Sequence, residues 1–313
     1  MNNKKVLITG GAGFIGSNIA EELAKDNEVV ILDDLSSGRM ENIRGLLENN
    51  KVRLIKGSIT DLDLLQQSFR GVDYVFHLAA IPGVPASVND PVASNIVNIN
   101  GTLNVLIAAQ DNGIRKVVNA SSCAVYGDAA VPPVAETSQL APKSPYAVTK
   151  LTGEYYCNVF REIYNQPTVS LRYFNVYGPR QDPGSEYAAV IPKFIAKVFA
   201  DDKLVIYGDG LQTRDFIFVK DVVRANIMAA ESGESGIFNI GSGEAVTINE
   251  LAEVIINLCG KNLEIVHVEP REGDIMHSRA SIERAGRIGY KPEYGLEEGL
   301  KETIGWFGSQ EML

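Results

Sequence analysis

The feature that most constrains the fold is a glycine-rich turn at residues 8–18, "ITGGAGFIGSN", which joins a short apolar run to a helical pattern. The run at residues 5–8 predicts a buried parallel strand, and the pattern at 15–25 predicts a helix. Gly11, Gly13 and Gly16 fit G-x-G-x-x-G, and Gly10 precedes Gly13 by three residues. Glycines let a backbone approach a pyrophosphate at a helix N-terminus, so the turn predicts a dinucleotide site. The alternative is a turn of purely structural use.

Apolar runs recur along the first half of the chain, with helical patterns between most of them. They lie at residues 28–34, 52–58, 73–80, 116–122 and 168–175. This alternation predicts an α/β fold with a parallel sheet covered on both faces. Because crossover connections are right-handed, the sheet is expected to be of the doubly wound, Rossmann type.

The alternation of strand and helix patterns ends after Asn175, where a Gly- and Pro-rich stretch indicates a loop. A helix is predicted at 190–203, short strands at 204–219, a helix at 251–260 and a strand at 263–270. We therefore predict a dinucleotide-binding Rossmann domain at 1–175 and a smaller second α/β domain at 176–313. A segment near 215–245 could return to the first domain.

Asp33 stands at the end of the second predicted strand. A carboxylate at this place can bond both ribose hydroxyls of NAD and repels the 2′-phosphate of NADP. The nearest arginine is Arg39, six residues later. The sequence therefore favours NAD over NADP.

The stretch "SPYAVTK" at residues 144–150 places Tyr146 and Lys150 four residues apart. Ser144 can cap a helix and Pro145 suits its first turn, so both side chains should share one face. A nearby ammonium lowers the pKa of a phenol, which would make Tyr146 a base near neutral pH. The alternative is an ordinary amphipathic helix.

Composition excludes several classes of protein. Hydrophobic residues make up 45% and charged residues 22%, as in an ordinary globular chain, and the formal charge of −10 argues against a nucleic-acid binder. The three cysteines and three histidines are scattered, so no metal site is expected. With no signal peptide and no run of 18 apolar residues, we expect a cytoplasmic protein without a membrane span.

The chain resembles the extended short-chain dehydrogenase/reductase family, and most of all its nucleotide-sugar 4-epimerases. The resemblance runs over nearly the whole length and rests on ten stretches in the same order: "TGGAGFIGSN", "DDLSSGR", "FHLAA", "NINGTLNVL", "SSCAVYGD", "SPYAVTK", "LRYFNVYGPRQ", "GDGLQTRDFIFVKDV", "FNIGSG" and "REGD". Tyr-x-x-x-Lys alone is a loose motif, whereas this ordered set is specific.

The resemblance implies a role for each matching residue. Tyr146 would be the catalytic base, Lys150 its partner and Ser122 the third catalytic residue. The cofactor NAD would contact Gly10, Gly13, Phe14, Ile15, Gly16, Asp33, Asp34, Leu35, Ser36, Ser37, Gly38, Ser58, Ile59, Leu78, Ala79, Ala80, Asn98, Ser121, Tyr146, Lys150 and Tyr173. A UDP-sugar substrate would contact Ser87, Ser122, Tyr146, Asn175, Ala189, Val190, Tyr207, Arg214, Arg271, Asp274 and Ser278.

Departures from relatives narrow the expected reaction. Related dehydratases carry Thr-Asp-Glu where this chain has Ser122, Cys123 and Ala124, and related decarboxylases carry a glutamate before "VYG". Without those carboxylates the resemblance implies epimerisation. Ser58 replaces an aspartate that reaches adenine in relatives, and NAD affinity could differ for this reason.

The resemblance also implies a substrate and an assembly. Ser278 falls where a bulky tyrosine would restrict the pocket to UDP-glucose and UDP-galactose. Serine is small, so we expect a UDP-GlcNAc/UDP-GalNAc 4-epimerase with some activity on non-acetylated sugars. The alternatives are an enzyme restricted to non-acetylated sugars, or a non-catalytic NAD-binding sensor. A homodimer is expected through a four-helix bundle of helices near 95–110 and 146–163.

Overall fold

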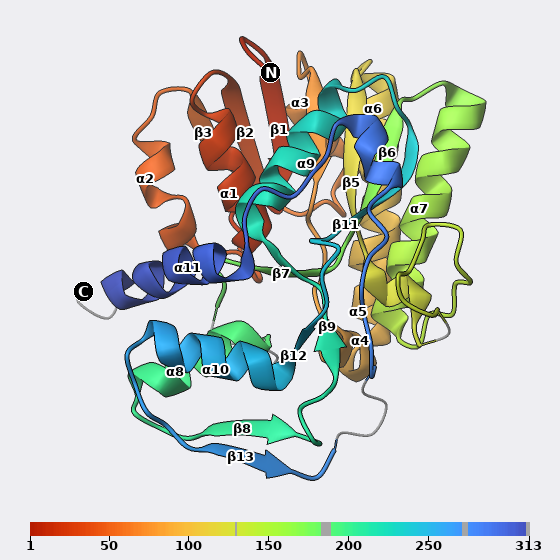
Figure 1. Ribbon diagram of the computed structural model, residues 1–313. Coiled ribbons are helices and arrows are strands. Elements are labelled where there is room, and N and C mark those ends of the chain that lie inside the picture. The colour runs from red at the N-terminus through yellow and green to blue at the C-terminus, as the bar shows by residue number, and fades with distance from the viewer. Residues whose placement is uncertain (129, 183–188, 271–274, 311–313) are drawn as a thin grey trace.

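The fold is built on one parallel sheet of seven strands (Figure 1). The computed structural model describes residues 1–128, 130–182, 189–270 and 275–310. Across the sheet the order is β11 (Gly236–Ile240), β6 (Thr168–Tyr173), β5 (Lys116–Ser122), β4 (Tyr74–His77), β1 (Lys5–Thr9), β2 (Glu28–Asp33) and β3 (Val52–Lys56). Every pairing within it is parallel. The predicted doubly wound α/β fold is confirmed.

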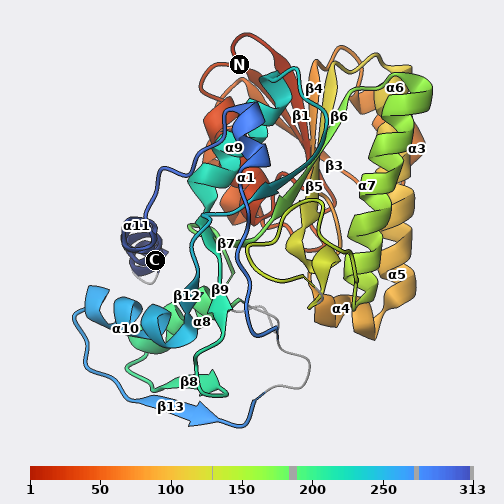
Figure 2. The same cartoon turned by 45° about the vertical axis from the view of Figure 1, so that its right-hand side comes forward.

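Helices cover both faces of this sheet (Figure 2). One layer contains α1 (Phe14–Leu23) and α9 (Val219–Glu231), and the other contains α3 (Leu62–Ser68), α6 (Gly101–Asp111) and α7 (Pro145–Tyr164). Val6 and Ile8 pack into one core while Leu7 packs into the other, and all three are fully buried. Because successive strand residues point to opposite faces, a sheet buried on both sides requires such a continuous apolar run.

Most elements that follow Phe174 form a smaller unit below the sheet with its own apolar core (Figure 1). Its elements are β7 (Asn175–Tyr177), α8 (Val190–Phe199), β8 (Leu204–Tyr207), β9 (Thr213–Arg214), β10 (Phe216–Phe218), β12 (Val246–Thr247), α10 (Ile248–Leu258), β13 (Ile265–Val268) and α11 (Leu296–Gln310). Strand β7 pairs with β10, β8 with β13, and β9 with β12.

The segment near 215–245 divides between the two units. Strand β10 belongs to the lower unit, whereas α9 packs on α1 and β11 completes the large sheet beside β6. The predicted strand at 168–175 is split at Phe174. The Phe174 amide donates to Ile240 O at 2.9 Å, and the next amide, of Asn175, donates to Asp215 O at 3.0 Å. The chain thus exchanges β11 for β10 as its neighbour and enters the lower unit.

A long helical stretch runs from α4 (Val84–Asn89) through α5 (Pro91–Asn95) and a π-helical turn at Ile96–Asn100 into α6. By length and composition alone, Pro91–Asp111 could cross a membrane, but 44% of its apolar window is buried within the fold. Its second half packs on α3 and α7, which identifies it as part of the helical layer. The short α2 (Arg44–Leu47) packs on β3, the edge strand at the far end of the sheet from β11.

Candidate active site

The glycine turn forms a close-packed cradle at the carboxyl end of β1. Gly10 has φ +69°, and a Cβ there would lie 2.6 Å from the Ala79 amide nitrogen. A Cβ on Gly16 would lie 2.2 Å from Gly10 O. The glycine turn therefore packs tightly against the loop after β4 on one side and against the first turn of α1 on the other. Only glycine permits this approach, and the space above the turn is the place where a dinucleotide diphosphate fits.

Asp33 is held in place by the backbone of that turn. Its Oδ2 accepts the Ala12 amide at 2.9 Å, and its Oδ1 accepts the Leu35 amide at 2.9 Å. Burial raises the pKa of Asp33, and these two hydrogen bonds counteract part of that rise. Each oxygen keeps acceptor capacity, and a Cβ on Gly38 would come within 2.7 Å of Oδ1. Asp33 therefore presents a fixed carboxylate to hydroxyl donors.

A cavity of about 540 Å³ extends from this carboxylate to Tyr146 and Lys150. Of the predicted cofactor residues, Leu35 and Asn98 do not line it, and all the others do. Leu35 acts through its amide on Asp33, and Asn98 bonds both backbone groups of Ile81, which does line the cavity. Lining residues that the sequence analysis missed are Leu32, Arg39, Asn42, Gly57, Ile81, Pro82, Val97, Ala120, Arg180 and Asp182.

Tyr146 and Lys150 lie in the first two turns of α7, and the predicted helix start is confirmed. Ser144 caps the helix by accepting the Ala147 amide at 3.2 Å, and Pro145 occupies its first turn. Lys150 Nζ is 5.8 Å from the centre of the Tyr146 ring and donates to Ala120 O at 2.9 Å. Ser122, at the end of β5, hydrogen-bonds the Tyr146 side chain.

The prediction that the pKa of Tyr146 is lowered is wrong for the protein without a bound cofactor. Burial raises the pKa of Tyr146 to about 12, and the hydrogen bond with Ser122 offsets only part of this rise. Burial also lowers the pKa of Lys150 to about 8. Spacing along a helix places two groups together, but desolvation penalises the charged form of each. A phenolate at Tyr146 therefore needs further positive charge in the site.

A buried polar chain beside these residues was missed by the sequence analysis. His77 Nδ1 lies 2.8 Å from Thr9 Oγ1, and its Nε2 lies 2.9 Å from Thr102 Oγ1. The Thr102 hydroxyl donates to Asn98 O at 2.6 Å, so it accepts from Nε2–H and fixes the tautomer. Asn98 Nδ2 donates to Thr149 Oγ1 at 3.1 Å, which connects the chain to α7. A histidine inside an apolar strand was the only signal in the sequence.

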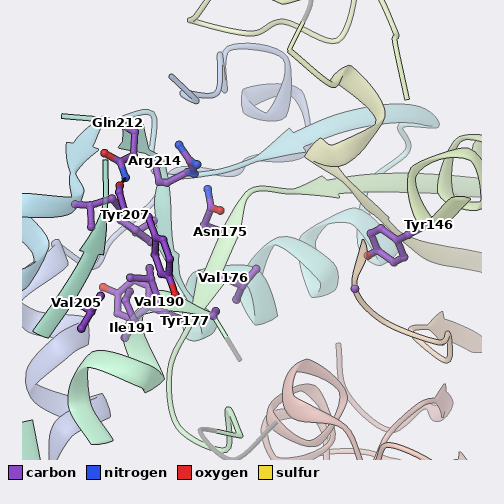
Figure 3. A pocket seen from close by; sticks show the side chains of 14 residues that line it. Tyr146, Asn175, Val176, Tyr177, Val190, Ile191, Val205, Tyr207, Gln212 and Arg214 are labelled. Atoms are coloured by element: carbon purple, nitrogen blue, oxygen red, sulfur yellow. Dashed lines mark hydrogen bonds between the residues drawn. The ribbon is translucent and has the colours of Figure 1, made fainter. Parts of the chain in front are cut away.

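A second cavity, of about 550 Å³, opens on the other side of Tyr146. Figure 3 shows Tyr146 on one side of it, with Asn175 between Tyr146 and the group formed by Tyr207, Gln212 and Arg214. The lining residues are Gly83, Tyr146, Asn175, Val176, Tyr177, Ala189, Val190, Ile191, Val205, Tyr207, Gln212, Arg214, Phe216 and Ile248. Of the described residues, Tyr146 is the one that lines both cavities.

Other predicted substrate residues lie outside this lining. Among the described residues, Ser87, Ser122 and Ser278 do not line the second cavity. Ser87 is fully buried, and its hydroxyl donates to Val84 O at 2.7 Å and accepts the Tyr146 amide at 3.0 Å, so it joins α4 to α7. The Ser278 amide donates to Thr213 O at 3.1 Å, next to Arg214. Arg271 and Asp274 lie outside the described residues.

Taken together, the fold and these two cavities are those expected of an α/β enzyme: the first cavity suits a dinucleotide, and Tyr146 lines both cavities. Residues 6–241 match the NAD dependent epimerase/dehydratase family, and the chain belongs to this family. The resemblance inferred from the motifs is confirmed, and so is NAD as the cofactor.

Several relatives match over nearly the whole chain. A UDP-glucose 4-epimerase of Mycolicibacterium smegmatis is 40% identical and covers 97% of this chain and 98% of its own. A solved UDP-N-acetylglucosamine 4-epimerase of Methanobrevibacter ruminantium, in complex with UDP-N-acetylmuramic acid, is 46% identical with a TM-score of 0.96, covering 99% and 100%. A UDP-glucose 4-epimerase of Thermotoga maritima, solved with UDP-glucose, is 37% identical with a TM-score of 0.93, covering 98% and 99%.

Proposed function

We propose that the protein is an NAD-dependent 4-epimerase of UDP-hexoses, with UDP-GlcNAc and UDP-GalNAc as its preferred pair and some activity on UDP-glucose and UDP-galactose. The observation that carries this proposal is the position of Tyr146 between the two cavities. A single acid–base group is therefore accessible from the cofactor cavity and from the proposed sugar cavity. This arrangement suits oxidation and re-reduction of C4 of the sugar. The relatives named above support the same reaction.

In this proposal the Tyr146 phenolate takes the proton of the sugar 4-hydroxyl as the 4-keto sugar forms. The phenol produced in this way returns the proton to the 4-oxygen after the sugar has turned over. When bound, NAD supplies the acceptor and donor of the hydride at C4 and, when oxidised, a positive charge in the cavity that Tyr146 lines. Lys150 adds a second positive charge near the phenol, and Ser122 hydrogen-bonds the reacting tyrosine. Together these groups stabilise the phenolate that burial disfavours.

The far end of the second cavity suits the nucleotide diphosphate. Arg214 supplies a cation there, and its Nη1 donates to Thr213 O at 2.9 Å and Ile275 O at 2.5 Å, which holds the guanidinium between two segments. Tyr207, a residue that is 40% exposed, presents an aromatic ring that suits stacking on a base. Asn175 lies between these residues and Tyr146 (Figure 3). A substrate held at this end could turn its sugar while the diphosphate stays bound.

The preference for N-acetylated sugars rests on Ser278. Ser278 does not line the second cavity, but its amide is bonded to Thr213, the residue before the lining residue Arg214, so we expect a much larger side chain at position 278 to narrow that cavity. The high similarity to a UDP-N-acetylglucosamine 4-epimerase supports a pocket with room for an acetamido group. Names of other relatives favour UDP-glucose as the alternative substrate.

The experiment incubates the protein with UDP-GlcNAc and UDP-glucose separately and resolves the C4 epimers. Ser278→Tyr should cut kcat/KM for UDP-GlcNAc by roughly ten- to a hundredfold, the scale of a steric change in a pocket, and spare UDP-galactose. Ser278→Thr is the control, because threonine keeps the hydroxyl and adds only one methyl group, and it should retain UDP-GlcNAc turnover. Equal losses on both substrates, or on neither, would show that Ser278 does not select the sugar. No turnover of any UDP-sugar by the NAD-loaded protein would favour the sensor alternative.

We also propose that the protein is a homodimer. Val88, Val92 and Ile96 are 60%, 67% and 45% exposed on one helical stretch, and Tyr155 and Ile163 are 57% and 67% exposed on α7 beside it. These residues form an apolar face on two adjacent helices. The exposed apolar residues of the first stretch lie at 84–96 and overlap the expected 95–110 only at its start, because much of 101–109 is buried in the fold. A second copy would cover it as a four-helix bundle.

Light scattering tests this assembly. Val92→Glu with Ile163→Glu should convert a particle of two chains into one chain, because each protomer brings both charges into the same face. Val131→Glu is the control, since Val131 is 83% exposed and lies outside this face. A double variant that keeps the mass of the wild type would exclude this face as the interface.

A further inference from the structure

Residues 178–182, here called the strap, cross from the lower unit to the cofactor cavity. The strap follows β7, and Arg180 and Asp182 within it line the same cavity as the glycine turn and Asp33. Part of the wall of the NAD site therefore comes from a segment distant in sequence from the other lining residues: Asp182 lies 143 residues after Arg39, which lines the same cavity. The sequence analysis assigned no cofactor contact to the strap.

The strap is docked on α1 by three polar contacts. Asn18 Nδ2 donates to Pro179 O at 3.2 Å, and the Arg180 guanidinium donates to Ser17 O at 3.0 Å and to Glu21 Oε2 at 2.9 Å. Arg180 adopts φ +72°, a left-handed conformation that is unfavourable for a residue with a side chain.

An ion pair closes the strap at its far end. The Arg39 guanidinium contacts the Asp182 carboxylate, and the Arg39 amide donates to Ala12 O at 3.0 Å within the glycine turn. The pair thus joins the end of the strap to the loop that follows Asp33. Both residues line the cavity, so the ion pair bridges two of its walls.

We propose that the strap retains NAD in this enzyme, with the Arg39–Asp182 ion pair as its clasp. A dinucleotide that lies along the glycine turn is then enclosed by the strap on the side of α1, and it leaves when the clasp parts. Retention suits a reaction that regenerates its cofactor in every cycle, since no exchange is needed. The clasp acts on the cofactor alone, so it is independent of which sugar the enzyme converts.

The test measures release of NAD from the purified holoenzyme, by quantifying nucleotide in the filtrate after dilution. Arg39 and Asp182 are 52% and 29% exposed, and an ion pair of this exposure is worth little, so Asp182→Asn should speed release by about two- to fivefold. Arg39→Gln should have a similar effect, and the double variant should be no faster than either single one. The exchanged pair R39D/D182R should restore slow release.

Salt and a remote ion pair provide the controls. Raising NaCl to about 1 M should speed release from the wild type and leave Asp182→Asn unchanged, because salt screens an exposed pair. Asp202→Asn, which breaks the exposed pair with Lys197, should release NAD at the native rate. The proposal is overturned if Asp182→Asn releases NAD at the native rate, or if only Arg39→Gln has an effect, which would make Arg39 a direct ligand of the cofactor. It is also overturned if the two single effects multiply in the double variant.

Discussion

His77 should make the stability of this protein fall in mild acid. Its side chain is 3% exposed, and both ring nitrogens are bonded to threonine hydroxyls. Burial, and then the charge of Lys150, lower the pKa of His77 from 6.5 to about 3. The neutral tautomer fits its partners, because Nε2–H donates to Thr102 and Nδ1 accepts from Thr9. Protonation would place an unpaired charge in the core.

The sign follows from where the protons bind. Below pH 6.5 the unfolded chain protonates His77 and the folded chain does not, so the unfolded state gains stability as the pH falls. The free energy of unfolding should drop by about 1.4 kcal/mol per pH unit between pH 6.5 and about pH 3. At pH 5 this single residue costs about 2 kcal/mol relative to pH 7.

Urea unfolding followed by circular dichroism at pH 7 and pH 5, with saturating NAD, measures this loss. His77→Gln is the control, because glutamine offers a neutral donor and acceptor but does not titrate. The variant should be less stable at pH 7 and should lose about 2 kcal/mol less than the wild type on going to pH 5. Other titrating groups cancel in this comparison. Equal losses in the two proteins would refute the assignment of a buried neutral His77.

Three substitutions test the site. Tyr146→Phe should lower kcat by roughly 10²- to 10⁴-fold with NAD content unchanged, and near-normal turnover would exclude Tyr146 as the base. Asp33→Asn should weaken NAD binding by roughly ten- to a hundredfold and admit NADP, as read by calorimetry; an unchanged preference would contradict the role of the carboxylate. Gly16→Ala should lose stability and NAD, because its Cβ meets Gly10 O at 2.2 Å, whereas Gly305→Ala in an uncrowded helix should not destabilise the protein. Equal melting temperatures for the two alanine variants would contradict this reasoning.

The sequence by itself determined the features that depend on local spacing. The glycine turn, the carboxylate at the end of β2 and the pair Tyr146–Lys150 lie where the patterns predicted them. Each follows from the period of a strand or helix and from the conformational freedom of glycine, which neighbouring residues fix. The doubly wound sheet followed for the same reason, because continuous apolar runs can be buried only when both faces are covered.

Only the tertiary structure decided the properties that depend on burial and on distant segments. Spacing placed Lys150 beside Tyr146, but packing raised the pKa of the phenol, because desolvation depends on everything that surrounds it. The clasp between Arg39 and Asp182 joins residues that no local pattern relates. The position of Tyr146 between two cavities likewise requires β7 to leave the large sheet and form the second wall, a path set by long-range pairing and not by the residues around the tyrosine.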